Sequence, residues 1–201
     1  MEALKRVIDM AHVVGAPLVR IMTQRKEPIL WGKNGAERWN VAHGVWNSMP
    51  PMIAPAVELA KSEGVVLVVE TGNGTLVNSN YTARKLIDDL GAKDTLKVLW
   101  DPGNNCWCHE LAYPDGYVEL RGGYLGHIHI KDVQVDTPRA LLAVRRMGEG
   151  QLKDLFQPIA DALRADCYDG VISFESVYHP GNGNFEDGFR LCVDRFKEVF
   201  S

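Results

Sequence analysis

Three carboxylates and one imidazole follow successive apolar segments of the chain. Glu70, Asp101, His129 and Glu175 each stand at or near the C-terminal end of a predicted strand. Brought together, they would suit one divalent metal ion, Mn²⁺, Mg²⁺ or Zn²⁺, because a cation removes the repulsion between neighbouring carboxylates. The alternative is that each polar residue merely meets water or caps the next helix. Four compatible residues at recurring strand ends favour the metal site.

The segment GHIHIKD offers three further polar side chains. His127 and His129 are two residues apart, so on a strand they share a face, and periodicity does not choose the ligand between them. Lys131 extends the same face and could hold a substrate oxygen. Its alternative is a solvated lysine at a strand end. We assign His127 and Lys131 to substrate binding.

A tight turn is predicted at DPGN, residues 101–104, where proline and glycine favour a bend. Asp101 could therefore cap this turn instead of binding metal. Asn104 could offer a hydrogen bond to a hydroxylated ligand. The glycine loop ETGNG lacks the spacing of a phosphate-binding or dinucleotide motif, so it predicts no nucleotide.

Two other groups have competing interpretations. A cysteine zinc site at Cys106, Cys108 and His109 is disfavoured because the C-x-C spacing is unusual for zinc. An aromatic segment after the first strand either covers a substrate or packs in the core, and packing is slightly favoured. Its residues are Trp31, Trp39, His43 and Trp46.

Helical and strand patterns alternate along the whole chain and would position these side chains. The expected helices lie at 2–14, 52–63, 79–91, 117–121, 152–163 and 189–200, and the clear strands at 18–22, 65–70, 96–100, 125–130 and 171–175. A repeat of roughly 30 residues is typical of βα units, and apolar strands between amphipathic helices indicate a parallel sheet. Polar residues after several strands favour a TIM-type barrel over an open doubly wound sheet.

Bulk composition describes one domain over residues 1–201. The net charge of −4 gives no reason to expect nucleic acid as a partner, and a small molecule is the expected ligand. The N-terminal segment lacks the apolar core of a signal peptide, and no uncharged run approaches the ~20 residues of a membrane span. Four cysteines without a tight framework fit a reducing compartment, which predicts a cytoplasmic protein.

Five segments carry a family resemblance in their order and spacing: VVLVVETGNG, KVLWDPGN, LGHIHIKD, GEG at 148–150 and YDGVISFES. Together they resemble the sugar phosphate isomerase/epimerase (xylose isomerase-like) family, from about residue 3 to the C-terminus. The resemblance places the family's metal ligands on Glu70, Asp101, His129 and Glu175, and so selects His129 over His127. It also implies that Glu70 and Glu175 are the catalytic bases, which exchange a proton beside a carbonyl through a metal-stabilised enediolate.

The chain departs from relatives of this family at particular positions. Family epimerases commonly carry a histidine where Asn104 stands and a glutamate where Leu76 stands. The related endonuclease IV branch uses extra histidines and a D-x-H segment before its glycine turn. The corresponding AVRRMGEG has neither, so we expect one metal ion and no DNA repair.

By the same resemblance, the chain begins where the family has its second helix. We therefore expect an incomplete barrel of about six βα units, with a sixth strand at 139–144 between His129 and Glu175. An open barrel exposes strand edges and apolar helix faces, which suggests a homo-oligomer. The leading function is a sugar isomerase or epimerase. The alternatives are a lyase or dehydratase on a polyol or keto-sugar, and an inactive fragment or binding module.

Overall fold

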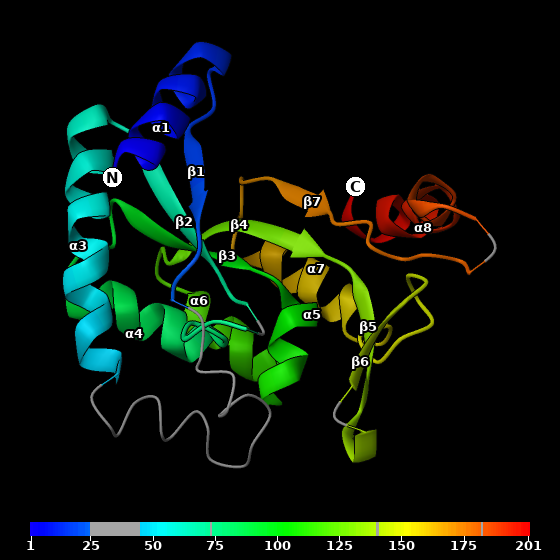
Figure 1. Cartoon of the computed structure of the whole chain (residues 1–201). Helices are drawn as coiled ribbons and strands as arrows, with labels where there is room; N and C mark the ends of the chain where they lie inside the picture. Colours follow the sequence, from blue (N-terminus) through cyan, green and yellow to red (C-terminus); the bar gives the residue numbers. More distant parts are fainter. Residues whose placement is uncertain (25–44, 73, 140, 182) are drawn as a thin grey trace.

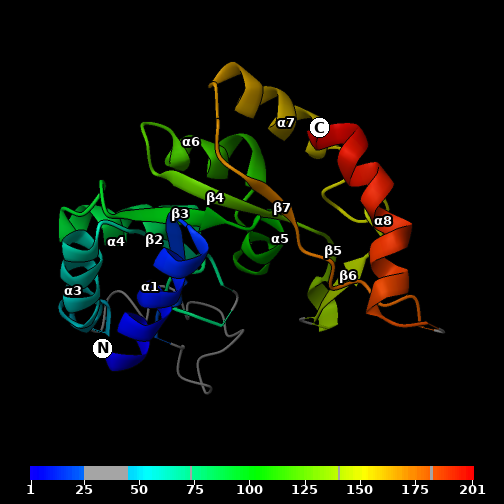
Figure 2. The same cartoon turned by 90° about the horizontal axis from the view of Figure 1, so that it is seen from above.

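Helices and parallel strands alternate in the computed structural model, which describes residues 1–24, 45–72, 74–139, 141–181 and 183–201. The sheet has the order β1 (Leu18–Ile21), β2 (Val66–Glu70), β3 (Leu96–Trp100), β4 (Leu125–Ile130) and β7 (Ile172–Phe174), and neighbouring strands are parallel. The longer helices are α1 (Glu2–Val14), α3 (Val45–Glu63), α4 (Asn80–Leu90), α7 (Phe156–Ala165) and α8 (Phe185–Phe200). They lie on the outside of a curved, open sheet (Figures 1 and 2). The fold is the incomplete TIM-type barrel expected from the sequence.

Local signals in the sequence explain several helix ends. Gly15 and Gly91 end α1 and α4 in the left-handed conformation, which glycine adopts without a Cβ penalty. Ser79 begins α4 with a capping box, in which its side chain accepts a hydrogen bond from the backbone of Thr82. The predicted helix limits at residues 14, 79 and 91 are thus confirmed to within one residue, as is the short helix α6 (Tyr117–Leu120).

Helix α3 begins earlier than the apolar periodicity predicts. It starts at Val45 rather than near residue 52, with Pro50, Pro51 and Pro55 inside it. Trp46 is buried and its Nε1 donates a 2.7 Å hydrogen bond to Asp89 Oδ2 on α4. This tertiary contact stabilises a first turn that sequence periodicity does not indicate.

The strand predicted at 139–144 exists but lies outside the barrel sheet. It is β6 (Leu141–Arg145), which pairs antiparallel with β5 (Asp132–Asp136) in a separate hairpin. Its alternating exposure is typical of an antiparallel strand with one solvated face, whereas barrel strands are covered on both faces. Strand β7 pairs directly with β4, so the expectation of an intervening strand was wrong.

The two outer strands of the sheet, β1 and β7, remain open on one side. No other described strand pairs with either of these edges. Helix α1 also shows apolar side chains to solvent, including Val13 and Val14, which are 79% and 68% exposed. Open edges and exposed apolar residues are the features expected of an incomplete barrel.

Of the helices described, none combines the length and the apolarity that crossing a bilayer requires.

Candidate metal centre

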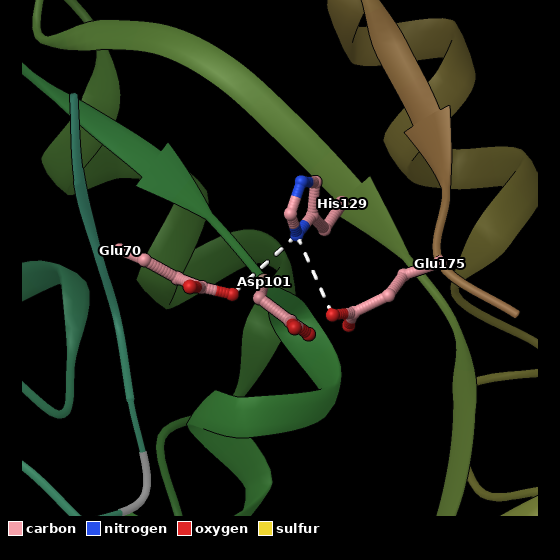
Figure 3. Close-up of side chains that lie close together, drawn as sticks. All are labelled: Glu70, Asp101, His129 and Glu175. Carbon is pink, nitrogen blue, oxygen red and sulfur yellow. Dashed lines mark ion pairs between the residues drawn. The ribbon is translucent and has the colours of Figure 1, made fainter. Parts of the chain in front are cut away.

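Four polar side chains converge at the carboxyl ends of the barrel strands. Glu70 ends β2, Asp101 follows β3, His129 lies near the end of β4, and Glu175 follows β7. One ligand atom from each lies within 4.8 Å of all the others (Figure 3). Because parallel strands end at the same rim of a barrel, residues distant in the sequence meet there. The structure thus brings together all four residues of the predicted set.

A buried nitrogen of His129 lies between two carboxylates without a hydrogen bond. Nδ1 is 3.4 Å from Glu70 Oε1 and 3.8 Å from Glu175 Oε1, and the described residues give it no hydrogen-bond partner. A buried polar atom without a partner costs about 1–3 kcal/mol. A cation between the nitrogen and the carboxylates would satisfy this atom, so the donor set fits a divalent metal ion.

His127 lies on the same face as His129 but has a different partner. The two rings meet edge to face with centroids 5.3 Å apart. Nε2 of His127 makes a 2.9 Å hydrogen bond with Ser173 Oγ on β7. Burial lowers the pKa of His127, and the neighbouring His129 lowers it further. The geometry therefore directs His129, and not His127, toward the carboxylates, while the substrate-binding role of His127 stays a prediction.

Asp101 is both a helix cap and a member of the cluster. Its Oδ1 accepts a 3.0 Å hydrogen bond from the backbone N–H of Asn104, which caps the short helix α5 (Pro102–Asn105). Its side chain is wholly buried, and burial raises its pKa to about 6, although Lys131 opposes the shift. The predicted capping by Asp101 is thus confirmed, and the same carboxylate lies in the cluster, where its role as a metal ligand stays a prediction.

Lys131 bridges two of the carboxylates. Its Nζ contacts both Asp101 Oδ2 and Glu175 Oε2. Burial acts to raise the pKa of Glu175, but Lys131 and His129 outweigh burial and the pKa is lowered. The pKa of Asp101 is raised despite the same ammonium, because Asp101 is the more deeply buried carboxylate. Lys131 therefore belongs to the centre, and its contact with substrate stays a prediction.

Arg20 is a charged residue of the centre that the sequence interpretation missed. It lies in β1, and its guanidinium contacts Glu70 Oε2. The available signal was an arginine inside the otherwise apolar strand LVRI. Only the pairing of β1 with β2 shows which carboxylate it meets.

A hydrogen-bond network fixes the ends of β2 and β3 against each other. Thr71 Oγ1 donates to Asn105 Oδ1 at 3.0 Å and accepts from the backbone N–H of Asp101 at 3.3 Å. Asn104 Nδ2 donates to the carbonyl oxygen of Thr71 at 3.0 Å. Asn105 Nδ2 in turn donates to the partly buried Glu110 carboxylate. The amide group of Asn104 thus positions the rim, and its proposed contact with substrate stays a prediction.

The other groups considered from sequence lie apart from this centre. Cys106 Sγ donates to the carbonyl oxygen of Pro102, and Cys108 Sγ lies 3.3 Å from that of Asn78. Among the residues with described positions, the four residues above form the one group that could hold a metal ion. Trp46 packs in the core, as favoured. Trp31, Trp39 and His43 lie outside the described residues.

The family assignment agrees with this fold and site. The sequence model of the xylose isomerase-like TIM barrel family matches residues 1–195. The chain therefore belongs to the xylose isomerase-like TIM barrel family, and the resemblance read from its motifs is confirmed.

One curated protein similar to this chain is a dehydratase by name. Inosose dehydratase of Clostridium perfringens is 25% identical over 88% of this chain and 63% of its own length. The chain thus spans less than two thirds of that curated relative.

Solved structures reproduce the fold at lower identity. IOLI, solved with a zinc atom, is 17% identical with a TM-score of 0.76, over 100% of this chain and 68% of that one. The 3-keto-D-glucoside 4-epimerase YcjR from E. coli is 17% identical with a TM-score of 0.71, over 98% and 70%.

Proposed function

We propose that this chain holds one divalent metal ion through Glu70, Asp101, His129 and Glu175, and acts on a sugar or polyol as an isomerase or epimerase. The observation that supports the proposal is the unpartnered Nδ1 of His129, facing carboxylates at 3.4 and 3.8 Å. Mn²⁺, Mg²⁺ and Zn²⁺ all accept this mixture of oxygen and nitrogen donors, and the choice among them stays open.

The two glutamates occupy different environments on opposite sides of the cluster (Figure 3). Glu175 is 28% exposed and Glu70 is 3% exposed. A bound divalent ion supplies Lewis-acid stabilisation of negative charge on substrate oxygens. Glu175, the more accessible carboxylate, removes the proton from the carbon beside the carbonyl, which yields an enediolate. Glu70 would serve the opposite side of the substrate carbon, as epimerisation requires.

Lys131 has a supporting role in this chemistry. Its ammonium contacts Asp101 and Glu175 and lies largely buried, where a charge interacts more strongly than in water. It keeps Glu175 ionised, which a base requires. It can also donate a hydrogen bond to a substrate oxygen.

Dehydration is a second candidate, because a curated protein similar to this chain is named inosose dehydratase. The first step is the same removal of a proton beside a carbonyl. In dehydration the enediolate then expels a β-hydroxyl, which leaves as water after protonation. The two reactions therefore share a site and differ in the fate of one intermediate.

Deuterium exchange tests the shared step and the products separate the two reactions. Mn²⁺-loaded protein is incubated in D₂O with ketoses and keto-polyols, and products are examined by NMR and mass spectrometry. The proposal predicts deuterium at the carbon beside the carbonyl, lost in Glu175→Gln. An epimer or isomer keeps the full composition apart from deuterium, whereas a dehydrated product is lighter by one water. Metal-loaded protein that exchanges no proton in any of these substrates would contradict the proposal.

The remaining expectations form part of the same proposal. We place the protein in the cytoplasm, with a small-molecule substrate and no nucleic-acid or membrane partner. A homo-oligomer that covers the open edges is also proposed, because exposed strand edges and apolar helix faces favour association.

A further inference from the structure

Arg20 reaches the metal centre from a strand that contributes none of the four ligands. It pairs in register with Val68 on β2, so its side chain shares the inner face of the sheet with Glu70, two residues further on. Its guanidinium contacts the Glu70 carboxylate and lies 3.6 Å from Met22 Sδ. The Arg20 side chain is nevertheless 50% exposed, whereas Glu70 is 3% exposed. Arg20 therefore lies between the buried carboxylate of Glu70 and the open inner face of the sheet.

The charges of the centre indicate which kind of ligand Arg20 could bind. Three carboxylates face two side-chain cations, Lys131 and Arg20, so the cluster carries one net negative charge. A divalent ion reverses this to one net positive charge. An arginine does not lose its proton in proteins, so the excess cannot be relieved by deprotonating Arg20. The metal-loaded centre is thus suited to a ligand that carries a negative charge.

The guanidinium has donors available for such a ligand. Of its five N–H groups, those on Nη2 face Glu70 and Met22, and the described part of the chain shows no partner for the others. A guanidinium binds carboxylate and phosphate groups through two parallel hydrogen bonds, which neutral hydroxyl groups do not match. Arg20 would then discriminate between ligands by their charge at the metal centre.

We infer that Arg20 binds an acidic group of the substrate, and that this enzyme acts on a keto-polyol that bears a carboxylate or a phosphate. The inference rests on the proposed function, since it concerns the ligand of the same metal centre. The alternative hypothesis is that Arg20 serves only as a counter-ion for Glu70. These two roles predict different responses to substitution of Arg20.

Calorimetric titration of Mn²⁺-loaded protein tests the inference without measuring turnover. The ligands are 2-ketogluconate for the carboxylate, fructose 6-phosphate for the phosphate, and fructose as the neutral comparison. We expect the wild type to bind at least one acid more tightly than fructose. Arg20→Met should weaken the binding of that acid by about 10- to 100-fold, because charged hydrogen bonds are lost. The affinity for fructose should stay unchanged. Arg20→Lys should retain part of the affinity as a single-point charge. The control Arg6→Met removes an exposed arginine of α1 and should change nothing.

Manganese titration of the same samples separates the possible failures. Removal of a positive charge beside Glu70 should leave Mn²⁺ affinity equal or higher in Arg20→Met, opposite in sign to its effect on acid binding. Wild-type protein that binds Mn²⁺ but prefers neither acid over fructose overturns the inference alone. So does acid binding that survives in Arg20→Met. Wild-type protein that binds no Mn²⁺ overturns the proposed function itself.

Discussion

Nδ1 of His129 lies 3.4 Å from Oε1 of Glu70, buried and without a hydrogen-bond partner among the described residues. Two strands, β2 and β4, hold this pair at the rim of the sheet although β3 lies between them. Such an arrangement is costly without a cation and favourable with one.

Metal should stabilise the fold through His129 and not through His127. Addition of Mn²⁺ at 100 times its dissociation constant should raise the free energy of unfolding of the wild type by about 2.7 kcal/mol. His129→Ala should lose most of this gain, because it removes a donor of the cluster. His127→Ala is the matched control and should keep the gain. Thermal unfolding with and without Mn²⁺ measures both, and loss of the gain in the His127 variant would reverse the ligand assignment.

Asp132 organises the glycine turn beyond the hairpin. Its carboxylate accepts hydrogen bonds from the backbone N–H groups of Val133, Gly148, Gly150 and Leu152, at 2.8–3.2 Å. Asp132→Asn turns an NH₂ group toward buried donors and should lower the free energy of unfolding by about 1–3 kcal/mol.

Urea denaturation measures this effect, with the partly exposed Asp136→Asn, on the same hairpin, as the comparison. Equal, small losses in the two variants would contradict the anchoring role of Asp132.

Gly188 is required by close approach of the chain. In helix α8, a Cβ at Gly188 would lie 1.9 Å from the backbone oxygen of Tyr178. Gly-to-Ala changes inside helices ordinarily stabilise by about 0.5–1 kcal/mol. Gly188→Ala should instead destabilise, by about 1–3 kcal/mol, because the packed chain must move. Urea denaturation measures whether the free energy of unfolding rises or falls. Asp194→Ala on the same helix serves as a near-neutral control. A stabilised Gly188→Ala would show that Tyr178 does not approach the helix in this way.

Cys106 should resist thiol reagents as the pH rises. Burial raises the pKa of its thiol to about 12. Only the thiolate reacts, so an ordinary thiol becomes reactive near pH 9, whereas folded Cys106 stays protonated. Cys167 is exposed and serves as an internal control. Alkylation of native protein at pH 7–9, followed by peptide mapping, should label Cys167 and spare Cys106 until urea is added. Equal labelling rates in native protein would contradict the burial of Cys106.

Much of the architecture was predictable because local signals and tertiary structure agree. Ser79, Gly15 and Gly91 mark helix ends by their own backbone chemistry. Glu70 and Glu175 were identifiable because polar residues that follow apolar strands gather at one rim of a parallel barrel. The choice of His129 over His127 needed the family resemblance, since strand periodicity treats the two residues alike.

The remaining features depend on contacts between distant segments. The contact of Arg20 with Glu70 arises from the pairing of β1 with β2, which no local pattern specifies. The direct pairing of β4 with β7 depends on how the chain places the β5–β6 hairpin. The early start of α3 depends on the contact of Trp46 with Asp89. These features are set by tertiary structure and not by local propensity.

Metal content of the purified protein tests the central claim most directly. Elemental analysis of the native chain is compared with His129→Ala and Glu175→Gln, after exposure to Mn²⁺, Mg²⁺ or Zn²⁺ and removal of unbound ion. The account predicts one divalent ion per native chain and its loss in both variants, while far-ultraviolet circular dichroism shows each variant folded. A native chain that binds no ion, or folded variants that keep it, would contradict the metal centre. The first of these results would favour an inactive fragment or a binding module instead.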